Sequence, residues 1–507
     1  MTTQAGASAN NKTVTTKHAD YVRMAPKWRR CREVAEGQDA IQANGHAYLP
    51  QLTDQTPEAY QSYLKRATFF NATWRTICGL GGMMFRKPET IDAPAGITPL
   101  FDNVTMAGVP LHIFAQQLGL ECFTVGRVGV LVDYPINDAE GIVTVARAQQ
   151  MGMRPTLQSY TAESIINWRS GAINNVTTLL MVVLTEQVEV RVDEFASKPD
   201  TQYRVLDLVP DPADGTQMAY RVRIFRIDPA TDSQVQIGVD AFPLMNGKPL
   251  REIPFIFLGV DDITPAVCAP PLIDLVDLNI AHFRTSADYE HGCHFTGLPT
   301  PYVCGYTPMV EGEKLFIGST SAWVFPAPET RVGFLEFSGN GLGALQENLD
   351  RKEAQMAAIG ARLLAADKRT NETATTAAIH HGGETSILSA VAQVLSLGMT
   401  RALTIFRDWA GATGDVKYDI NRDFFPVPMD APTLLALVSA WQAGGISAEV
   451  LFENLQEGEI ISSDATFEKE QAKIANAPPI SSKINISKVL PAPAGATKSP
   501  AHPGLGA

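Results

Sequence analysis

Four side chains that commonly bind metals or act as nucleophiles lie close together in the middle of the chain: His291, Cys293, His294 and Cys304. Structural zinc sites hold the ion with four such ligands, which recur at fixed spacings such as Cys-x-x-Cys. The HGCH run with one distant cysteine matches none of these spacings. We therefore expect no metal and no cofactor here.

Other catalytic patterns are absent from the sequence. It contains no Gly-x-Ser-x-Gly nucleophile motif, no His-Glu-x-x-His zinc motif and no phosphate-binding Gly-x-x-x-x-Gly-Lys-Ser/Thr loop. The acidic pairs Asp261–Asp262 and Asp274/Asp277 could transfer protons, but such pairs are common on surfaces and at helix ends. We expect no enzymatic activity. A hydrolase that uses Cys293 or His294 is a minor alternative.

Two glycine clusters have the composition of phosphate-binding turns. Gly339, Gly341 and Gly343 follow an expected strand and open an expected helix, but no acidic partner follows in a βαβ context, which favours a plain helix start. A second cluster of three glycines lies within 79–82, in the predicted helix TFFNATWRTICGLGGMMF, and no Lys-Ser/Thr follows it. Because glycine weakens an isolated helix, we expect close packing against another backbone there.

The helix that would position the central His and Cys residues is strongly amphipathic. Two prolines at 270–271 favour a helix start, and apolar residues then recur every three or four positions: Leu272, Leu275, Val276, Ile280, Phe283 and Ala287. The other face is predicted to be charged or polar: Asp274, Asp277, Asn279, Arg284, Asp288 and Glu290. We expect Gly292 to end the helix and Leu298–Gly305 to form a strand. Periodicity alone favours an ordinary amphipathic helix on a core.

The amino-acid sequence of this stretch also resembles that of a known family. The run DLNIAHFRTSADYEHGCHFTGLPTPYVCGY resembles the central helix-to-strand passage of tailed-bacteriophage portal proteins, in particular a portal-like family catalogued as a domain of unknown function. Further passages are similar in the same order: TFFNATWRTICGLGGMMF with RKP, TVGRVGVLVD, the strand–glycine–helix join at 332–345, and the C-terminal helices around GGIS and EGEIISSD. The resemblance extends over roughly residues 20–475.

The resemblance implies an α+β portal-protein fold. Residues 20–265 would form a mixed α/β wing, 266–294 the stem helix, and 295–337 a small clip of β structure. Long helices would follow at 338–425, with a mobile tunnel loop at 368–383, and then a helical crown at 426–475. The two ends, 1–19 and 476–507, are polar or rich in Pro, Ala and Ser and are predicted to be disordered.

Within the wing, the sequence predicts the helix Leu111–Cys122, a sharp turn at Gly126 and a strand that ends at Asp133. Ile253–Leu258 is continuously apolar, and we expect it to be a central strand. Further strands are indicated by alternation of apolar and polar residues: Leu157–Trp168, Thr177–Leu184, Val188–Phe195, Tyr203–Val209 and Ala219–Ile227.

The function that the resemblance implies is structural. The chain would form a homo-oligomeric ring, expected as a dodecamer, at one capsid vertex, where the genome is packaged and ejected and the tail attaches. The partners would be the terminase large subunit, capsid and scaffold proteins, a head-tail adaptor, and double-stranded DNA that passes through without sequence specificity. The location would be the virion, and the host cytoplasm during assembly. A structural adaptor or minor capsid protein without a DNA channel is the alternative.

Candidate residues follow from these assignments. Those that could face DNA in the tunnel loop are Lys368, Arg369, Thr370 and Thr373. The candidates for packing of the stem helix are Leu272, Leu275, Val276, Ile280 and Phe283.

Composition and charge restrict other functions. The net charge of −13 over 507 residues argues against a module that grips DNA by its phosphates, but not against a conduit that DNA slides through. Residues 1–90 are the exception, with 12 Lys and Arg against 7 Asp and Glu. Six cysteines without a Cys-x-x-Cys pair fit a reducing compartment. No uninterrupted apolar run reaches the length of a membrane span and the N-terminus is polar, so we expect no membrane segment and no secretory signal.

Overall fold

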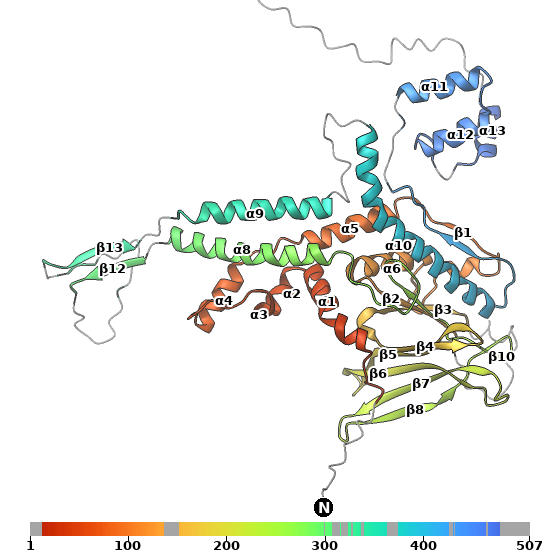
Figure 1. The fold of residues 1–507 in the computed structure, drawn as a ribbon, viewed down its shortest axis with the longest axis horizontal. Helices are drawn as coiled ribbons and strands as arrows, with labels where there is room; N and C mark the ends of the chain where they lie inside the picture. Colours follow the sequence, from red (N-terminus) through yellow and green to blue (C-terminus); the bar gives the residue numbers. More distant parts are fainter. Residues whose placement is uncertain are drawn as a thin grey trace, which may run out of the picture. The chain divides into compact units, whose positions relative to one another are not determined.

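The computed structural model describes residues 13–135, 152–298, 300–306, 315, 323–325, 328–335, 339–361, 374–424, 429, 431–462 and 465–476. The chain divides into two compact units, Met1–Phe424 and Phe425–Ala507. The larger unit combines runs of helices with runs of antiparallel strands, and the smaller unit is helical where it is described (Figure 1). The predicted α+β class is confirmed.

Six helices open the larger unit: α1 (Ala19–Glu36), α2 (Gln38–Ala43), α3 (Gly45–Tyr48), α4 (Pro57–Arg66), α5 (Ala72–Met84) and α6 (Leu111–Val125). α5 is the predicted glycine-rich helix, and its N-cap Asn71 accepts a hydrogen bond from the Trp74 amide at 2.9 Å. A Cβ atom at Gly81 would lie 2.8 Å from a methyl group of Leu120 on α6. The close packing is therefore present, but against a side chain rather than the backbone that we expected.

The core of the larger unit contains a three-stranded antiparallel sheet in the order β11-β2-β3, formed by β2 (Val128–Asp133), β3 (Thr156–Thr161) and β11 (Phe255–Leu258). Gly126 adopts a φ of +77° at the end of α6 and turns the chain into β2, as predicted. The prediction that Ile253–Leu258 is a central strand is wrong, because β11 lies at the sheet edge. It is fully buried because a helix covers it: a Cβ atom at Gly398 of α10 (Ala374–Trp409) would lie 2.0 Å from Leu258.

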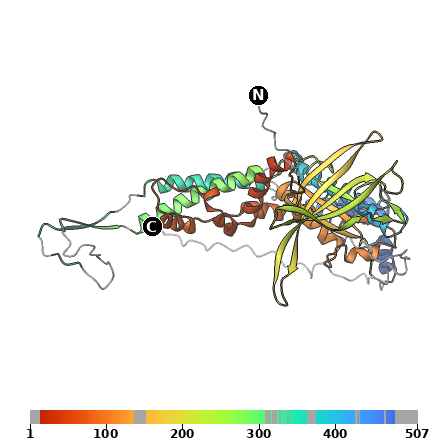
Figure 2. The same ribbon diagram turned by 90° about the horizontal axis from the view of Figure 1, so that it is seen from below.

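A second, five-stranded sheet is an antiparallel meander of β4 (Ile165–Ile173), β5 (Val176–Arg191), β6 (Ser197–Pro210), β7 (Met218–Asp228) and β8 (Ser233–Ala241). Its long hairpins stand out from the neighbouring helices (Figure 2). The two strands predicted at 177–184 and 188–195 are one continuous strand, β5. β8 was not predicted, although Val235, Ile237 and Val239 alternate along it as in other strands.

Two short antiparallel pairs and two 3₁₀ turns complete this body. β1 (Thr90–Asp92) pairs with β14 (Lys417–Asp419), and β9 (Leu244–Met245) pairs with β10 (Lys248–Pro249). The 3₁₀ turns are η1 (Thr98–Asp102) and η2 (Ala162–Ser164).

α10 differs from the prediction at its beginning. Its backbone is helical from Ala374, so the part of the predicted tunnel loop over 374–383 is helix rather than loop. Three alanines among the first five residues, 374–378, favour this conformation and outweigh the threonines.

The later part of α10, Ile387–Trp409, is the one helix among the described residues that is long and apolar enough to cross a membrane, with a mean hydropathy of 1.3. Polar residues interrupt its apolar residues, so the expectation of no membrane-length segment did not include it. More than half of this segment is buried within the protein, where side chains such as Val391, Leu395 and Phe406 are fully enclosed. A core helix of this kind has the same composition as a membrane span.

The smaller unit contains α11 (Ala431–Gln442), α12 (Ala448–Glu457) and α13 (Phe467–Asn476). Ser447 caps α12 by accepting a hydrogen bond from the Val450 amide at 3.1 Å. Phe452 of α12 and Phe467 of α13 meet edge to face, with ring centroids 5.7 Å apart. α11 and α12 lie within the region predicted as the crown, 426–475, and α13 ends one residue beyond it.

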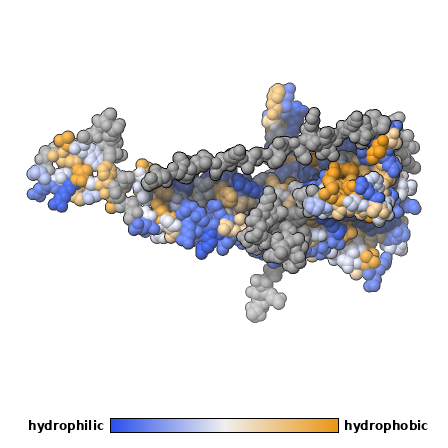
Figure 3. Space-filling model, turned by 90° about the horizontal axis from the view of Figure 1, so that it is seen from above, coloured by the Kyte–Doolittle hydropathy of each residue, from blue (hydrophilic) through white to orange (hydrophobic). Residues whose placement is uncertain are grey.

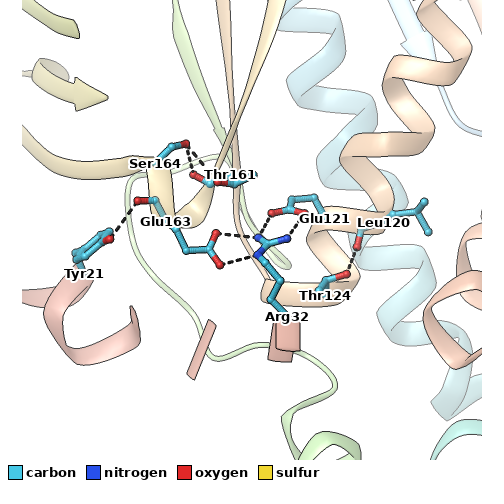
Figure 4. A network of polar contacts seen from close by, with 8 residues as sticks. All are labelled: Tyr21, Arg32, Leu120, Glu121, Thr124, Thr161, Glu163 and Ser164. Carbon is cyan, nitrogen blue, oxygen red and sulfur yellow. Dashed lines mark hydrogen bonds and ion pairs between the residues drawn. The ribbon is translucent and has the colours of Figure 1, made fainter. Parts of the chain in front are cut away.

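Arg32 of α1 joins three elements of the larger unit (Figure 4). Its guanidinium donates to both carboxylate oxygens of Glu163 in η2 at 2.8 Å, and to Glu121 of α6 at 2.5 and 3.3 Å. The Tyr21 hydroxyl, on the same helix as Arg32, donates to the Glu163 carbonyl at 3.1 Å. One cation therefore holds two carboxylates that would otherwise repel each other in a half-buried site.

Replacing Arg32 with methionine should lower the free energy of unfolding by about 2 kcal/mol, because it leaves two half-buried carboxylates without their cation. Arg29→Met is the matched control, since Arg29 is on the same helix and its side chain is 65% exposed beside Glu33. We expect it to cost about 0.5 kcal/mol or less. Urea unfolding followed by tryptophan fluorescence, to which the buried Trp28 of α1 contributes, measures both. Equal losses in the two variants would show that the network is not stabilising.

Candidate assembly interface

The central amphipathic helix is α8 (Ile273–Gly297), and its first half is embedded in the larger unit. The apolar residues proposed for stem packing are all at most 5% exposed: Leu272, Leu275, Val276, Ile280 and Phe283. Phe283 packs edge to face on Phe69, with ring centroids 5.8 Å apart. Leu272 precedes the helix as its N-cap residue, so the helix begins later than the predicted 266.

Asn279 was predicted on the charged face of this helix, and this is wrong. Its side chain is fully buried and makes three hydrogen bonds to the segment before and within α5. The amide oxygen accepts from the Thr73 amide at 3.2 Å and from the Thr73 hydroxyl at 3.0 Å, and the amide nitrogen donates to the Phe70 carbonyl at 2.8 Å. Every polar atom of Asn279 is thus matched, which removes most of the cost of burying it.

Several charged residues of α8 contact the N-terminal helices and are not simply exposed to solvent. Asp277 forms an ion pair with Arg30 of α1 at 3.2 Å. Arg284 donates to the carbonyl of Tyr48 at 2.7 Å, and Asp288 accepts from the hydroxyl of Tyr63 at 2.5 Å. The polar side of α8 is therefore a second packing surface.

α9 (Leu342–Met356) lies beside α8 and is followed by a π-helical turn, η3 (Ala357–Ala361) (Figure 1). Lys352 donates to the carbonyl of Ala281 at 2.8 Å and to the Thr285 hydroxyl at 2.5 Å. A Cβ atom at Gly292 would lie 2.7 Å from a methyl group of Leu342. Gly292 was expected to end the helix, but α8 continues to Gly297, and this glycine instead permits close contact with α9.

His282 is the buried titratable group between the two helices. Its side chain is 6% exposed, and Nε2 lies 3.2 Å from Oε1 of Glu353, whereas Nδ1 has no partner among the described residues. Burial lowers the pKa of His282 and outweighs the opposite effect of Glu353, and Lys352 lowers it further. A second proton would place an N–H group at Nδ1 with nothing to accept it, which explains the direction of the shift.

Beyond α8 and α9 the chain forms a two-stranded antiparallel hairpin of β12 (Thr300–Cys304) and β13 (Arg331–Leu335). Gly333 lies opposite Tyr302. A Cβ atom at Gly333 would lie 2.8 Å from the phenol ring, so the ring packs here because residue 333 has no side chain. Large apolar side chains are exposed on the hairpin and at the end of α8: Phe295, Leu298, Tyr302, Val332, Phe334 and Leu335, each at least 40% exposed.

These exposed side chains lie on both faces of the hairpin. Val332 and Phe334 share one face, and Tyr302 and Leu335 lie on the other, since side chains alternate along a strand. Figure 3 shows apolar and polar side chains mixed at this end of the larger unit. Within the described ranges, neither β12 nor β13 pairs with a further strand. A lone two-stranded hairpin is marginally stable in water, so its edges and faces are available to a partner.

The residues first considered for metal chemistry are not brought together. The His291 ring contacts Tyr63 and Phe295 edge to face, and Cys304 is on β12. Across the part of the chain that the structure describes, no three His, Cys, Asp or Glu side chains converge on a common point. All six cysteines are free thiols, and burial raises the pKa of the Cys31 thiol to about 12.

The four DNA-channel candidates, Lys368, Arg369, Thr370 and Thr373, lie outside the described residues. Their role stays a prediction. The sequence interpretation missed Asn279 and His282, although their spacing placed both close to the apolar stripe: Asn279 is four residues after Leu275 and three after Val276.

Comparisons with known proteins give one family and several solved structures. A domain of unknown function (DUF4055) matches residues 271–410, which is less than half of the chain and includes α8, α9 and α10. No curated protein matches the chain.

Three similar solved structures come from gene transfer agent particles. One is described as "Neck of empty GTA particle computed with C6 symmetry", with 11% identity, a TM-score of 0.34, and coverage of 83% of this chain and 98% of the other. A second, "Virion of native gene transfer agent (GTA) particle", has 11% identity, a TM-score of 0.35, and coverage of 82% and 96%. A third, "Neck of native GTA particle computed with C12 symmetry", has 10% identity, a TM-score of 0.35, and coverage of 82% and 98%. Scores this low do not establish a shared fold.

Acid should loosen the packing of α8 against α9. The pKa of His282 is lowered in the folded protein, so below its ordinary value of 6.5 the unfolded chain takes up a proton that the folded chain does not. Stability therefore falls as the pH decreases from 6.5 to the folded pKa, by up to about 1.4 kcal/mol per pH unit, and levels off below it. His282→Gln, which can still donate to Glu353, should reduce this loss.

Melting midpoints between pH 8 and pH 5 measure the effect. His46→Gln is the control, because that ring is exposed and stacks on Tyr60 away from α9. Wild type and the control should show the same pH slope and His282→Gln a smaller one. Identical slopes in all three proteins would contradict the assignment.

Proposed function

We propose that this chain is the ring-forming portal subunit of a tailed phage or phage-like particle. The β12–β13 hairpin is the observation that carries the proposal. It lies in the chain between α8 and α9, which pack against each other, and it has apolar side chains on both faces. Both of its strand edges are open among the described residues. Such a hairpin needs neighbours, and identical copies around an axis supply one on each side.

The sequence resemblance supports the same assignment. In portal proteins the stem helix and clip occupy the positions of α8 and of the β12–β13 hairpin, and the family match at 271–410 spans this region. The proposed location is the capsid vertex of the virion, with the host cytoplasm during assembly. The terminase, capsid, scaffold and adaptor proteins and the passing duplex are the proposed partners.

The proposal assigns no chemical step to this chain. A separate terminase would hydrolyse the nucleotide that drives packaging. The acidic net charge of −13 is compatible with a conduit, because a wall that repels phosphate does not retain DNA.

Purified wild-type protein should form closed rings, visible by negative-stain microscopy and mass photometry. Phe334→Asp places a charge on the hairpin where a 53% exposed ring now stands, and should raise the concentration needed for assembly by about 30-fold, the cost of losing one aromatic anchor at an interface. Met106→Asp is the matched control, because Met106 is 74% exposed and lies outside the arm formed by α8, α9 and the hairpin. It should assemble as wild type does.

Below the concentration at which wild type assembles, melting midpoints should be equal in the three proteins, since both sites are exposed. A wild-type protein that stays monomeric across concentration and salt would refute the ring. If Phe334→Asp forms rings as readily as wild type does, the hairpin is not part of the interface between copies. A ring whose channel is too narrow for duplex DNA would favour the adaptor or minor capsid alternative.

A further inference from the structure

The tip of the β5–β6 hairpin presents a single aromatic side chain to solvent. Phe195 is 93% exposed, the largest exposed fraction among the exposed large apolar residues of the described chain. The neighbouring Val192 is 60% exposed. Phenylalanine rarely stands free in this way without a partner, because its burial removes a large apolar area from water.

Hydrogen bonds hold this tip in one conformation. The carboxylate of Asp193 accepts from the amides of Phe195 and Ala196, both at 2.8 Å. The Arg191 guanidinium donates to the carbonyls of Asp193 at 2.8 Å and Glu194 at 3.4 Å. Phe195 is thus displayed on an ordered turn, which lowers the entropy lost on binding.

A pocket of about 400 Å³ lies at the other end of the same sheet. Its apolar lining comes from the β9–β10 segment, the chain before β11, and α10: Met245, Pro249, Leu250, Pro254 and Ile405. Leu250 accepts a hydrogen bond from the Tyr220 amide of β7 at 2.9 Å, and Arg251 donates to Asp211 and to the Met218 carbonyl, both at 2.8 Å. These bonds fix the pocket to the β6–β7 turn.

The tip and the pocket have opposite charges at their rims. Glu194 adds an exposed carboxylate beside Phe195, and Lys248 adds an exposed ammonium group to the pocket. Within the described part of the chain, neither side chain forms an ion pair or a hydrogen bond. The other charged groups of the pocket are already paired: Arg251 with Asp211, Glu252 with Arg401, and Asp408 with Arg407.

The two surfaces cannot meet within one chain. β6 runs from Ser197 at the tip to Pro210 beside the pocket, and a strand of this length spans roughly 45 Å. Complementary surfaces at opposite ends of one rigid sheet produce a head-to-tail contact, which closes into a ring when the rotation between copies allows it.

We infer that Phe195 of one copy inserts into the Met245–Ile405 pocket of the next copy, with Glu194 beside Lys248. This inference rests on the proposed ring, and it names a contact in the wing that is separate from the β12–β13 hairpin. The pocket volume is ample for one phenyl ring, and an apolar pocket with a charged rim is typical of an interface anchor.

Crosslinking between two differently tagged chains tests the contact directly. In a background with Cys78 and Cys304 replaced by serine, one chain carries Glu194→Cys and the other Lys248→Cys. Under mild oxidation the mixture should give a disulfide-linked heterodimer. The control pairs Glu194→Cys with Lys417→Cys, because Lys417 is 71% exposed on β14 and does not line the pocket. It should give no heterodimer above background.

Assembly measurements provide a second test. Phe195→Ser should raise the concentration needed for assembly by about 30-fold, and Val239→Ser, at an 86% exposed position on β8, should not change it. Glu194→Lys and Lys248→Glu should each weaken assembly by up to about 5-fold, and the double exchange should restore it.

The outcomes separate this contact from the proposed ring. Wild-type rings without a 194–248 crosslink, together with normal assembly of Phe195→Ser, would overturn the inference and leave the portal assignment standing. A specific 194–248 crosslink at high concentration in a protein that forms no closed ring would support the contact and overturn the portal assignment.

Discussion

The larger unit depends on α8 being buried on two sides. Its apolar stripe packs into the core, and the amide of Asn279 is enclosed with the Thr73 amide, the Thr73 hydroxyl and the Phe70 carbonyl as partners. A buried amide whose oxygen and nitrogen are both hydrogen-bonded fixes the axial position and rotation of a helix, because any slip leaves several polar groups unpaired at once. The first half of α8 is thereby held in place, and α9 packs beside the helix.

Much of this arrangement could be predicted from the sequence, but not the roles of its polar residues. The apolar residues of α8 followed helical spacing, and they are buried. Asn279 had the same spacing and was placed outside the stripe because amides are usually exposed. Its burial depends on Thr73 and Phe70, about 200 positions earlier in the chain, and local periodicity carries no information about such partners.

Two other differences have the same origin. The sequence of β11 predicts a central strand because every residue is apolar. In the structure β2 lies on one side of β11, and α10 rather than a second strand covers it. Burial is what the sequence encodes, and a helix or a strand satisfies it equally well. Gly292 reads as a helix end, but the side chain of Leu342 occupies the space that a Cβ atom would need. A glycine at a close approach and a glycine at a helix end cannot be separated without knowing what lies opposite.

Charge limits how copies of this chain can associate. Each copy carries a net charge of −13, so the repulsion between neighbours acts over the whole surface and is reduced by salt. Contacts made by apolar side chains keep their strength when salt is added, and ion pairs at an exposed rim lose theirs. The hairpin side chains and Phe195 are apolar, and only the pair Glu194 and Lys248 adds opposite charge. The proposed ring would be held at short range by hydrophobic contact and opposed at long range by charge. Copies that met in a wrong orientation would therefore separate, whereas those that seated these apolar side chains would stay together.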